Sequence, residues 1–305
     1  MRRDRRFFSH GARDAVWYGA WFVLGCALWV FFLNGGDIPF DFHDWAEVNA
    51  PRLAFVQDAL RKGVFPLHMP DASALRGVTD RYFSLPDVFF TPQLFLMKWL
   101  SVGEFVLAHF LILYAAGYIG LVRLSRRLKL SPAAFAVLFL IYNGNGHLLS
   151  HVAVGHATWG GTLLFSWFML WVYELYEEGE PPRGWPLKMG VLLFAIFLQG
   201  SFHQFVWCLL FLCAAVLTFW TRRGPDWARW KAVFSAGVCS VGLSAVRILP
   251  VAIQLDGFDD DFLGGYRSLR QLVRAFLIHV APADALDRTV TGGTLGWWEI
   301  GRAHV

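Results

Sequence analysis

Long apolar runs alternate with short polar turns along most of this chain. The runs cover residues 15–33, 103–124, 132–143, 158–176, 186–198, 202–220 and 232–253. Bilayer hydrocarbon satisfies no backbone hydrogen bond, so a segment that crosses it must be a helix of roughly 20 mostly apolar residues. The pattern therefore predicts an all-α fold, a polytopic membrane protein with about seven transmembrane helices.

The basic residues divide the turns into two classes. They precede the first run at Arg2, Arg3, Arg5, Arg6 and Arg13, and they return in the turns 123–129, 181–185 and 221–231. The turns 143–156 and 199–204 contain no Lys or Arg. Because short cytoplasmic loops are enriched in Lys and Arg, we expect a cytoplasmic N-terminus and a multi-pass protein of the bacterial inner (cytoplasmic) membrane.

The polar segments on the expected outer face have helical patterns of their own. Asn49 and Pro51 predict an N-cap followed by the first turn of a helix, and Gly63 predicts its end. Between them Leu53, Val56 and Leu60 share one face, as in an amphipathic helix that lies on a membrane surface. We therefore expect a transmembrane module over residues 1–253 with an outer loop at 34–102. An outer acidic loop and a second amphipathic helix follow at 254–299.

Composition supports a membrane protein and argues against a nucleic-acid-binding one. Hydrophobic residues make up 56% of the 305, the mean hydropathy is +0.44, and only 16% are charged, whereas soluble domains are about 45–50% apolar. The net charge of +4 comes from basic residues at the ends of apolar runs, so we expect no nucleic-acid partner. Residues 300–305, IGRAHV, match the translation of a common short-read sequencing adapter. We expect them to be an artefact and the chain to be a C-terminally truncated fragment.

Acidic residues gather directly after the first apolar run, at Asp37, Asp41, Asp44 and Glu47. Ionisable groups at a membrane boundary commonly line a cavity or a substrate path. If a helix begins at Asp41, Asp44 and Glu47 lie on one face and can divide general-base work and cation binding between them. We therefore predict Asp44, Glu47 and Asp41 as catalytic, and Mg²⁺ or Mn²⁺ at Asp44 and Glu47. The alternative is purely structural, with Asp41 as a helix N-cap and Asp44 favouring the helix dipole.

Histidines and arginines supply candidate contacts to a substrate phosphate. His151 and His156 lie in one expected outer turn, and His203 lies in another. They could line a wet cavity, contact a phosphate or hold zinc, although no Cys or fixed acid completes a zinc site. In the second amphipathic helix, Arg267, Arg270 and Arg274 form either a solvated stripe or a clamp for a lipid phosphate.

The order of these features resembles the GT-C superfamily of polytopic glycosyltransferases, and within it the bacterial YfhO-like membrane proteins. The resemblance rests on Asp44 in HDW, Arg52, GVFPLHMP at 63–70, RRLKLSPAAFAVLFLIYN and GHLLSHVAVGHATWGG. It implies that Asp44 takes the position of the catalytic acid that activates the acceptor near a polyprenyl-phosphate sugar. The stretch FPLHMP departs from the pattern, because His68 stands where relatives often carry an aromatic residue.

These features together favour one function over two others. We expect a membrane glycosyltransferase that moves a sugar from a polyprenyl-phosphate donor to a glycan, lipid or protein acceptor of the cell envelope, on the outer face. The first alternative is a transporter or flippase for a lipid or sugar, for which acids and broken helices at mid-membrane depth are typical. The second is a non-catalytic protein of envelope assembly.

Overall fold

The computed structural model describes residues 4–65, 88–177, 180–224 and 226–254, and every regular element in these ranges is helical. The chain divides into two units, residues 1–252 and 253–305, and every contact described below lies within the first. The predicted acidic loop and amphipathic helix at 254–299, with Arg267, Arg270 and Arg274, lie outside the described residues apart from Gln254 at the end of the last helix.

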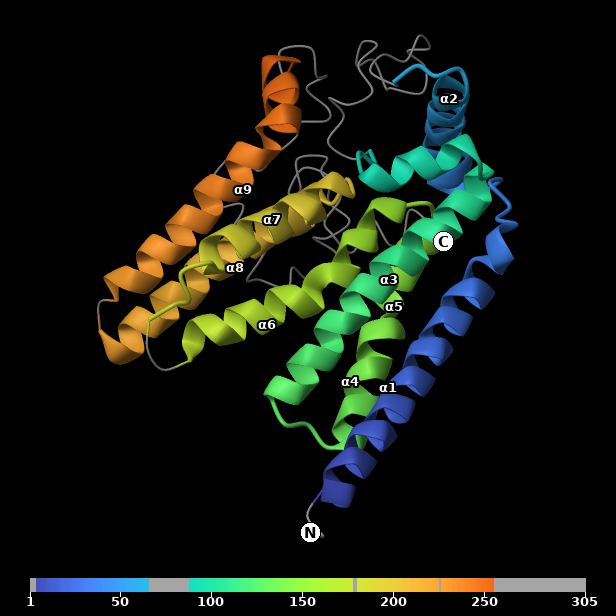
Figure 1. The fold of residues 1–305 in the computed structure, drawn as a ribbon. Helices are drawn as coiled ribbons and strands as arrows, with labels where there is room; N and C mark the ends of the chain where they lie inside the picture. The colour runs from blue at the N-terminus through green and yellow to red at the C-terminus, as the bar shows by residue number, and fades with distance from the viewer. Residues whose placement is uncertain (1–3, 66–87, 178–179, 225, 255–305) are drawn as a thin grey trace, which may run out of the picture. The chain divides into compact units, whose positions relative to one another are not determined.

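Seven of the described helices correspond to the predicted apolar runs (Figure 1). They are α1 (Asp4–Phe32), α3 (Val102–Arg127), α4 (Pro132–Asn143), α6 (Phe165–Tyr176), α7 (Trp185–Leu198), α8 (Phe202–Arg223) and α9 (Trp227–Gln254). The helix α5 (Gly146–Ala153) forms within the turn expected at 143–156, and η6 (Ala157–Leu164) covers the start of the run expected at 158–176. The other connecting segments contain α2 (Ala50–Arg61) and the short turns η1 (Asn34–Gly36), η2 (Trp45–Asn49) and η5 (Pro92–Lys98).

In the described part of the chain, five helical stretches are long and apolar enough to cross a membrane. They are Asp14–Phe32, Val102–Arg127, Pro132–Ala153, Phe202–Thr221 and Trp227–Leu249. The helix α7 is apolar but shorter, and α6 has 12 residues preceded by the 3-10 turn η6. The prediction of an all-helical membrane protein is confirmed, and the count of seven spans stays a prediction.

Local sequence signals explain where these helices begin. Ser101 and Glu104 form a capping box at the start of α3, with Ser101 N donating to Glu104 Oε2 over 2.7 Å. Ser131 caps α4 with Pro132 in its first turn, as SP predicts. The Gly-containing stretch after Asn143 ends α4, and the Asn145 side chain caps α5.

The helix α3 lies at the centre of the described bundle and packs against α1, α6 and η6. A Cβ at Gly117 would overlap the Leu163 carbonyl, so a larger residue there would push η6 away. The Ser166 hydroxyl donates to the Gly117 carbonyl over 2.6 Å at the same crossing. Small residues and a hydroxyl bond across a close helix contact are typical of packing inside membranes.

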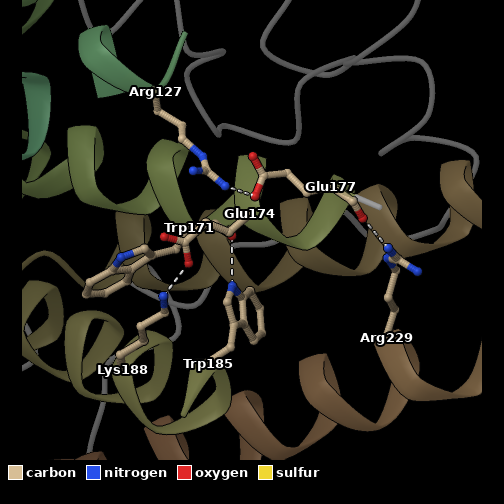
Figure 2. Close-up of polar contacts among 7 residues, drawn as sticks. All are labelled: Arg127, Trp171, Glu174, Glu177, Trp185, Lys188 and Arg229. Carbon is tan, nitrogen blue, oxygen red and sulfur yellow. Dashed lines mark hydrogen bonds and ion pairs between the residues drawn. The ribbon is translucent and has the colours of Figure 1, made fainter. Parts of the chain in front are cut away.

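Polar contacts join several helices at the end of α3 that carries the basic turns (Figure 2). Arg127 pairs with Glu177, and Lys188 pairs with Glu174. Arg229 donates to the Glu177 carbonyl over 2.6 Å, linking the start of α9 to the end of α6. Because α3 has 26 residues, this end lies about 39 Å from the helix start at a rise of about 1.5 Å per residue.

The amphipathic helix predicted after Asn49 is confirmed as α2. Its apolar residues Leu53, Val56 and Leu60 are buried in the protein core, where α2 packs against η2, η5 and α3. The Gln57 amide also donates to the Leu100 carbonyl over 2.6 Å. The apolar face therefore contacts protein, and the expectation that it lies on a membrane surface is corrected. This packing fixes the segment that follows α1.

Candidate functional site

The Asp44 carboxylate lies between two imidazole rings. His43 Nδ1 is 3.1 Å from Asp44 Oδ1, and His156 Nε2 is 2.9 Å from Oδ2. The side chains of His43, Asp44 and His156 are 22%, 20% and 24% exposed. A small molecule can therefore reach the group, although most of its surface is shielded from water.

A second histidine extends this arrangement behind His156. His151 Nδ1 is 2.7 Å from His156 Nδ1, and the His151 ring stacks on Trp159 with centroids 3.9 Å apart and planes at 6°. An N···N contact of this length needs one nitrogen as donor and the other as acceptor. If His156 Nε2–H donates to Asp44, a neutral His156 accepts at Nδ1 from His151, giving a continuous carboxylate–imidazole–imidazole chain.

Two side-chain hydrogen bonds hold the two segments of the site together. The Trp45 indole N–H donates to the Val152 carbonyl over 2.8 Å, and the Asn49 amide donates to the Gly155 carbonyl over 2.6 Å. Gly155 has φ 99°, and a Cβ on it would contact the Asp44–Trp45 backbone. The turn after α5 thus rests directly on the backbone that carries Asp44.

The backbone at His43 is held in an uncommon conformation. Its φ is 49°, in the left-handed region where non-glycine residues are infrequent, although histidine is enriched there. The helix that continues through η2 and α2 starts at His43, and Asp44 already has right-handed helical angles. Such conformations cost of order 1–3 kcal/mol and cluster at functional sites.

The other predicted acids lie apart from this group. Asp41 and Glu47 are exposed. The structure corrects the expected helix start from Asp41 to His43. The segment η2 is a π-turn, which holds more residues per turn than an α-helix. The α-helical spacing that would put Asp44 and Glu47 on one face is therefore absent. Among the described residues, the metal-ligating atoms that converge belong to His43, Asp44 and His156. The Mg²⁺ or Mn²⁺ site at Asp44 and Glu47 stays a prediction.

The predicted substrate contacts fall at different distances from Asp44. His156 contacts Asp44, and His151 contacts His156. The ring centroid of the exposed His203 is 6.2 Å from that of Trp207, whose centroid is 5.8 Å from that of Trp159. Arg52 is buried within α2, 4% exposed. The structure thus brings Asp44 together with the histidines of the turn at 143–156.

Sequence reasoning missed His43, Asn49 and Trp159. His43 adjoins Asp44, and that adjacency was the one available signal, because aspartate and histidine next to each other can ligate or orient together. Asn49 was expected to cap α2 but makes no side-chain capping bond and instead holds Gly155. In the sequence, nothing distinguishes Trp159 from an aromatic residue of the core, whereas in the structure its ring stacks on that of His151.

Comparisons of the chain with protein families, with curated proteins and with solved structures find no match. Within the residues that the structure describes, the fold defines the class, an all-helical membrane protein with five helices long and apolar enough to cross a bilayer. Its distinguishing group is a carboxylate flanked by imidazoles.

Proposed function

We propose that this protein is a membrane glycosyltransferase that uses a polyprenyl-phosphate sugar and works on the outer face of the bacterial inner membrane. The observation that carries the proposal is the chain from Asp44 to His156 to His151. A carboxylate backed by imidazoles is suited to take a proton from a hydroxyl group. Its place at one end of long apolar helices suits a substrate held in the bilayer by its lipid.

The reaction we propose is a displacement at the anomeric carbon. The acceptor hydroxyl gives its proton to the Asp44 carboxylate, and its oxygen forms a bond to the anomeric carbon. The bond from that carbon to the phosphate oxygen breaks, and polyprenyl phosphate leaves with the electron pair. Each carboxylate oxygen has more than one lone pair, so the contacts to His43 and His156 leave acceptor capacity on Asp44 for the proton.

Three features support this proposal besides the contacts themselves. The site lies at the end of α3 opposite the basic turns, and by the positive-inside rule that end faces outward. The chain also resembles GT-C glycosyltransferases in its sequence, and by that resemblance Asp44 would take the position of their catalytic acid. The roles of Arg52, and of Arg267, Arg270 and Arg274, as phosphate contacts remain predictions of this proposal.

The test is replacement of Asp44 by Asn, which keeps the shape of the side chain and removes its basicity. With membranes supplied with radiolabelled polyprenyl-phosphate hexose and pentose donors, we expect the rate of sugar transfer to fall by at least about 100-fold, the lower range for a general base. The matched control is Asp58→Asn, which removes an exposed carboxylate on α2 that pairs with Lys62. Wild-type transfer by folded Asp44→Asn would refute the assignment.

Transport of a lipid or sugar is the second candidate, and buried polar residues within the apolar helices favour it. His109 in α3 and Arg247 in α9 are both fully buried. Ionisable residues inside membrane spans often line a transport path. Movement of a fluorescent lipid-linked sugar across proteoliposomes, without donor consumption, would support transport over transfer. If neither process is detected, the non-catalytic role in envelope assembly becomes the better account.

A further inference from the structure

We propose that His43, Asp44 and His156 bind a divalent ion of the zinc class. The three residues each offer one ligand atom, and these atoms all lie within 4.8 Å of one another. Binding of the ion can be tested without any assumption about activity. Its role in catalysis, described below, rests on the proposed glycosyl transfer.

The distances fit a tetrahedral ion after a small closure of the group. Zinc lies about 2.0–2.1 Å from nitrogen and oxygen ligands, which puts neighbouring ligand atoms about 3.3 Å apart at tetrahedral angles. The two contacts to Asp44 measure 3.1 and 2.9 Å, and they run to its two different oxygens. An ion held by one of these oxygens therefore requires a turn of the carboxylate. The two histidine nitrogens, which lie within 4.8 Å of each other, would also need to approach to about 3.3 Å, the tetrahedral ligand separation. Both movements are within reach of side-chain rotation.

The donor set selects the kind of metal. Two imidazole nitrogens and one carboxylate oxygen suit Zn²⁺ and its neighbours, whereas Mg²⁺ prefers oxygen ligands and retained water. The ion proposed at His43, Asp44 and His156 therefore differs in kind from the Mg²⁺ or Mn²⁺ ion expected at Asp44 and Glu47. A site of three protein ligands with a fourth position open to water or substrate is the arrangement of catalytic zinc.

The remaining contacts of the group resemble the outer shell of a metal site. A histidine that ligates a metal through one nitrogen almost always donates a hydrogen bond from the other, which fixes its ring. His156 would ligate through Nε2 and donate from Nδ1 to His151 Nδ1, at the observed 2.7 Å. His151 is itself stacked on Trp159, so this outer support is rigid.

The backbone supports the same interpretation. The left-handed angle at His43 lets two consecutive side chains, His43 and Asp44, converge on one point instead of diverging as they would on a regular helix. With the ion bound, His156 Nε2 would ligate it and no longer donate to Asp44, so the ion would take the place of that hydrogen bond. The ion could then neutralise charge that develops on the leaving phosphate, while Asp44 binds it through one oxygen and keeps the second for the acceptor proton.

The experiment measures metal directly on the full chain, purified in detergent with an affinity tag that contains no histidine. After loading with ZnCl₂ and dialysis, we expect about one equivalent of zinc per chain by elemental analysis. CoCl₂ should give the visible absorption of a four-coordinate ion. His43→Ala, Asp44→Asn and His156→Ala should each bind zinc at least about 100-fold more weakly. His151→Ala should weaken binding by about 10–100-fold, the range for loss of an outer-shell partner.

Two further variants separate ligation from structural damage. His156→Cys supplies a thiolate in place of the imidazole and should restore zinc binding that His156→Ala loses. His147→Gln, in the same helix as His151 but outside the ligand group, should bind as the wild type does. Equal metal content in all these folded proteins would show adventitious binding and overturn the inference. Full sugar transfer by metal-free protein would overturn the catalytic role alone, and zinc binding without transfer would leave the site standing while refuting the proposed function.

Discussion

Substitution of Gly155 tests how the site is built, because Gly155 packs directly against the backbone of Asp44 and Trp45. A Cβ placed on Gly155 would lie 2.7 Å from the Asp44 carbonyl carbon, and it would overlap the Trp45 nitrogen more closely still. Ordinary contact begins at 3.4 Å, so Gly155→Ala must push the Asp44 backbone away by about 0.7 Å or more, given close packing of protein interiors.

The magnitude follows from two costs. A left-handed conformation costs an L-residue roughly 1–2 kcal/mol, and overpacking typically costs about 1–3 kcal/mol. We therefore expect Gly155→Ala to lower the free energy of unfolding by roughly 2–5 kcal/mol. Where the protein still folds, displacement of a catalytic group by about 1 Å can cost about 100-fold in rate, and we expect a loss approaching that in sugar transfer.

Gly146→Ala is the matched control, because a Cβ there meets nothing within 4 Å and Gly146 is the first residue of α5. It should leave stability unchanged or raise it by up to about 1 kcal/mol. Unfolding by SDS titration in mixed micelles measures both variants. Equal stability and equal transfer for Gly155→Ala and the wild type would refute the close contact between the α5 turn and Asp44.

Three further predictions concern the scaffold. Ser101→Ala removes half of the capping box with Glu104 and should destabilise the protein by about 0.5–2 kcal/mol in the same titration. Tyr114→Phe removes hydroxyl bonds to carbonyls of α1 at 3.1 and 3.3 Å and should cost about 1 kcal/mol, loosening α1 in hydrogen exchange. Burial opposes ionisation of Asp226, but hydrogen bonds from Arg229 outweigh it and hold the Asp226 pKa below its usual value. Its stabilisation is therefore present above the unfolded pKa of about 3.9 and lost as pH falls through the lower folded pKa, so the stability difference from Asp226→Asn should vanish there. A difference that does not depend on pH would contradict that linkage.

Much of the helical framework could be predicted because it depends on local sequence. Apolar length identifies the long helices, Ser131 with Pro132 marks the start of α4, and Pro51 with its following apolar face marks α2. The 3-10 turn η6 was not predicted. Its sequence is as apolar as the helix that follows, and only the close packing of Gly160 against Phe110 and of Gly161 against Ser201 accompanies the change.

The candidate site could be predicted only in part. The cluster of acids after the first run directed attention to Asp44, and the Lys- and Arg-free turn directed it to His151 and His156. Nothing local indicates that these two segments touch, because the contact depends on how α3, α4 and α5 bring the turn back to the start of the outer loop. The role of His43 could not be predicted either, because the sequence does not reveal the left-handed backbone angle of this residue.

The π-turn at Trp45–Asn49 has a consequence for how this protein tolerates changes in length. A π-turn corresponds to one residue added to an α-helix. Loss of a single residue between 45 and 49 would let the segment relax to regular α-helical winding, and the parts before and after it would keep their orientation because the π-turn already absorbs the extra residue. Loss of a second residue there has no π-turn to absorb it. The part before the deletion would then rotate by about 100° relative to α2, at 3.6 residues per turn, and Asp44 would turn away from His156 although every helix survived. Variants two residues shorter here should thus keep the bundle and lose the contact between Asp44 and His156.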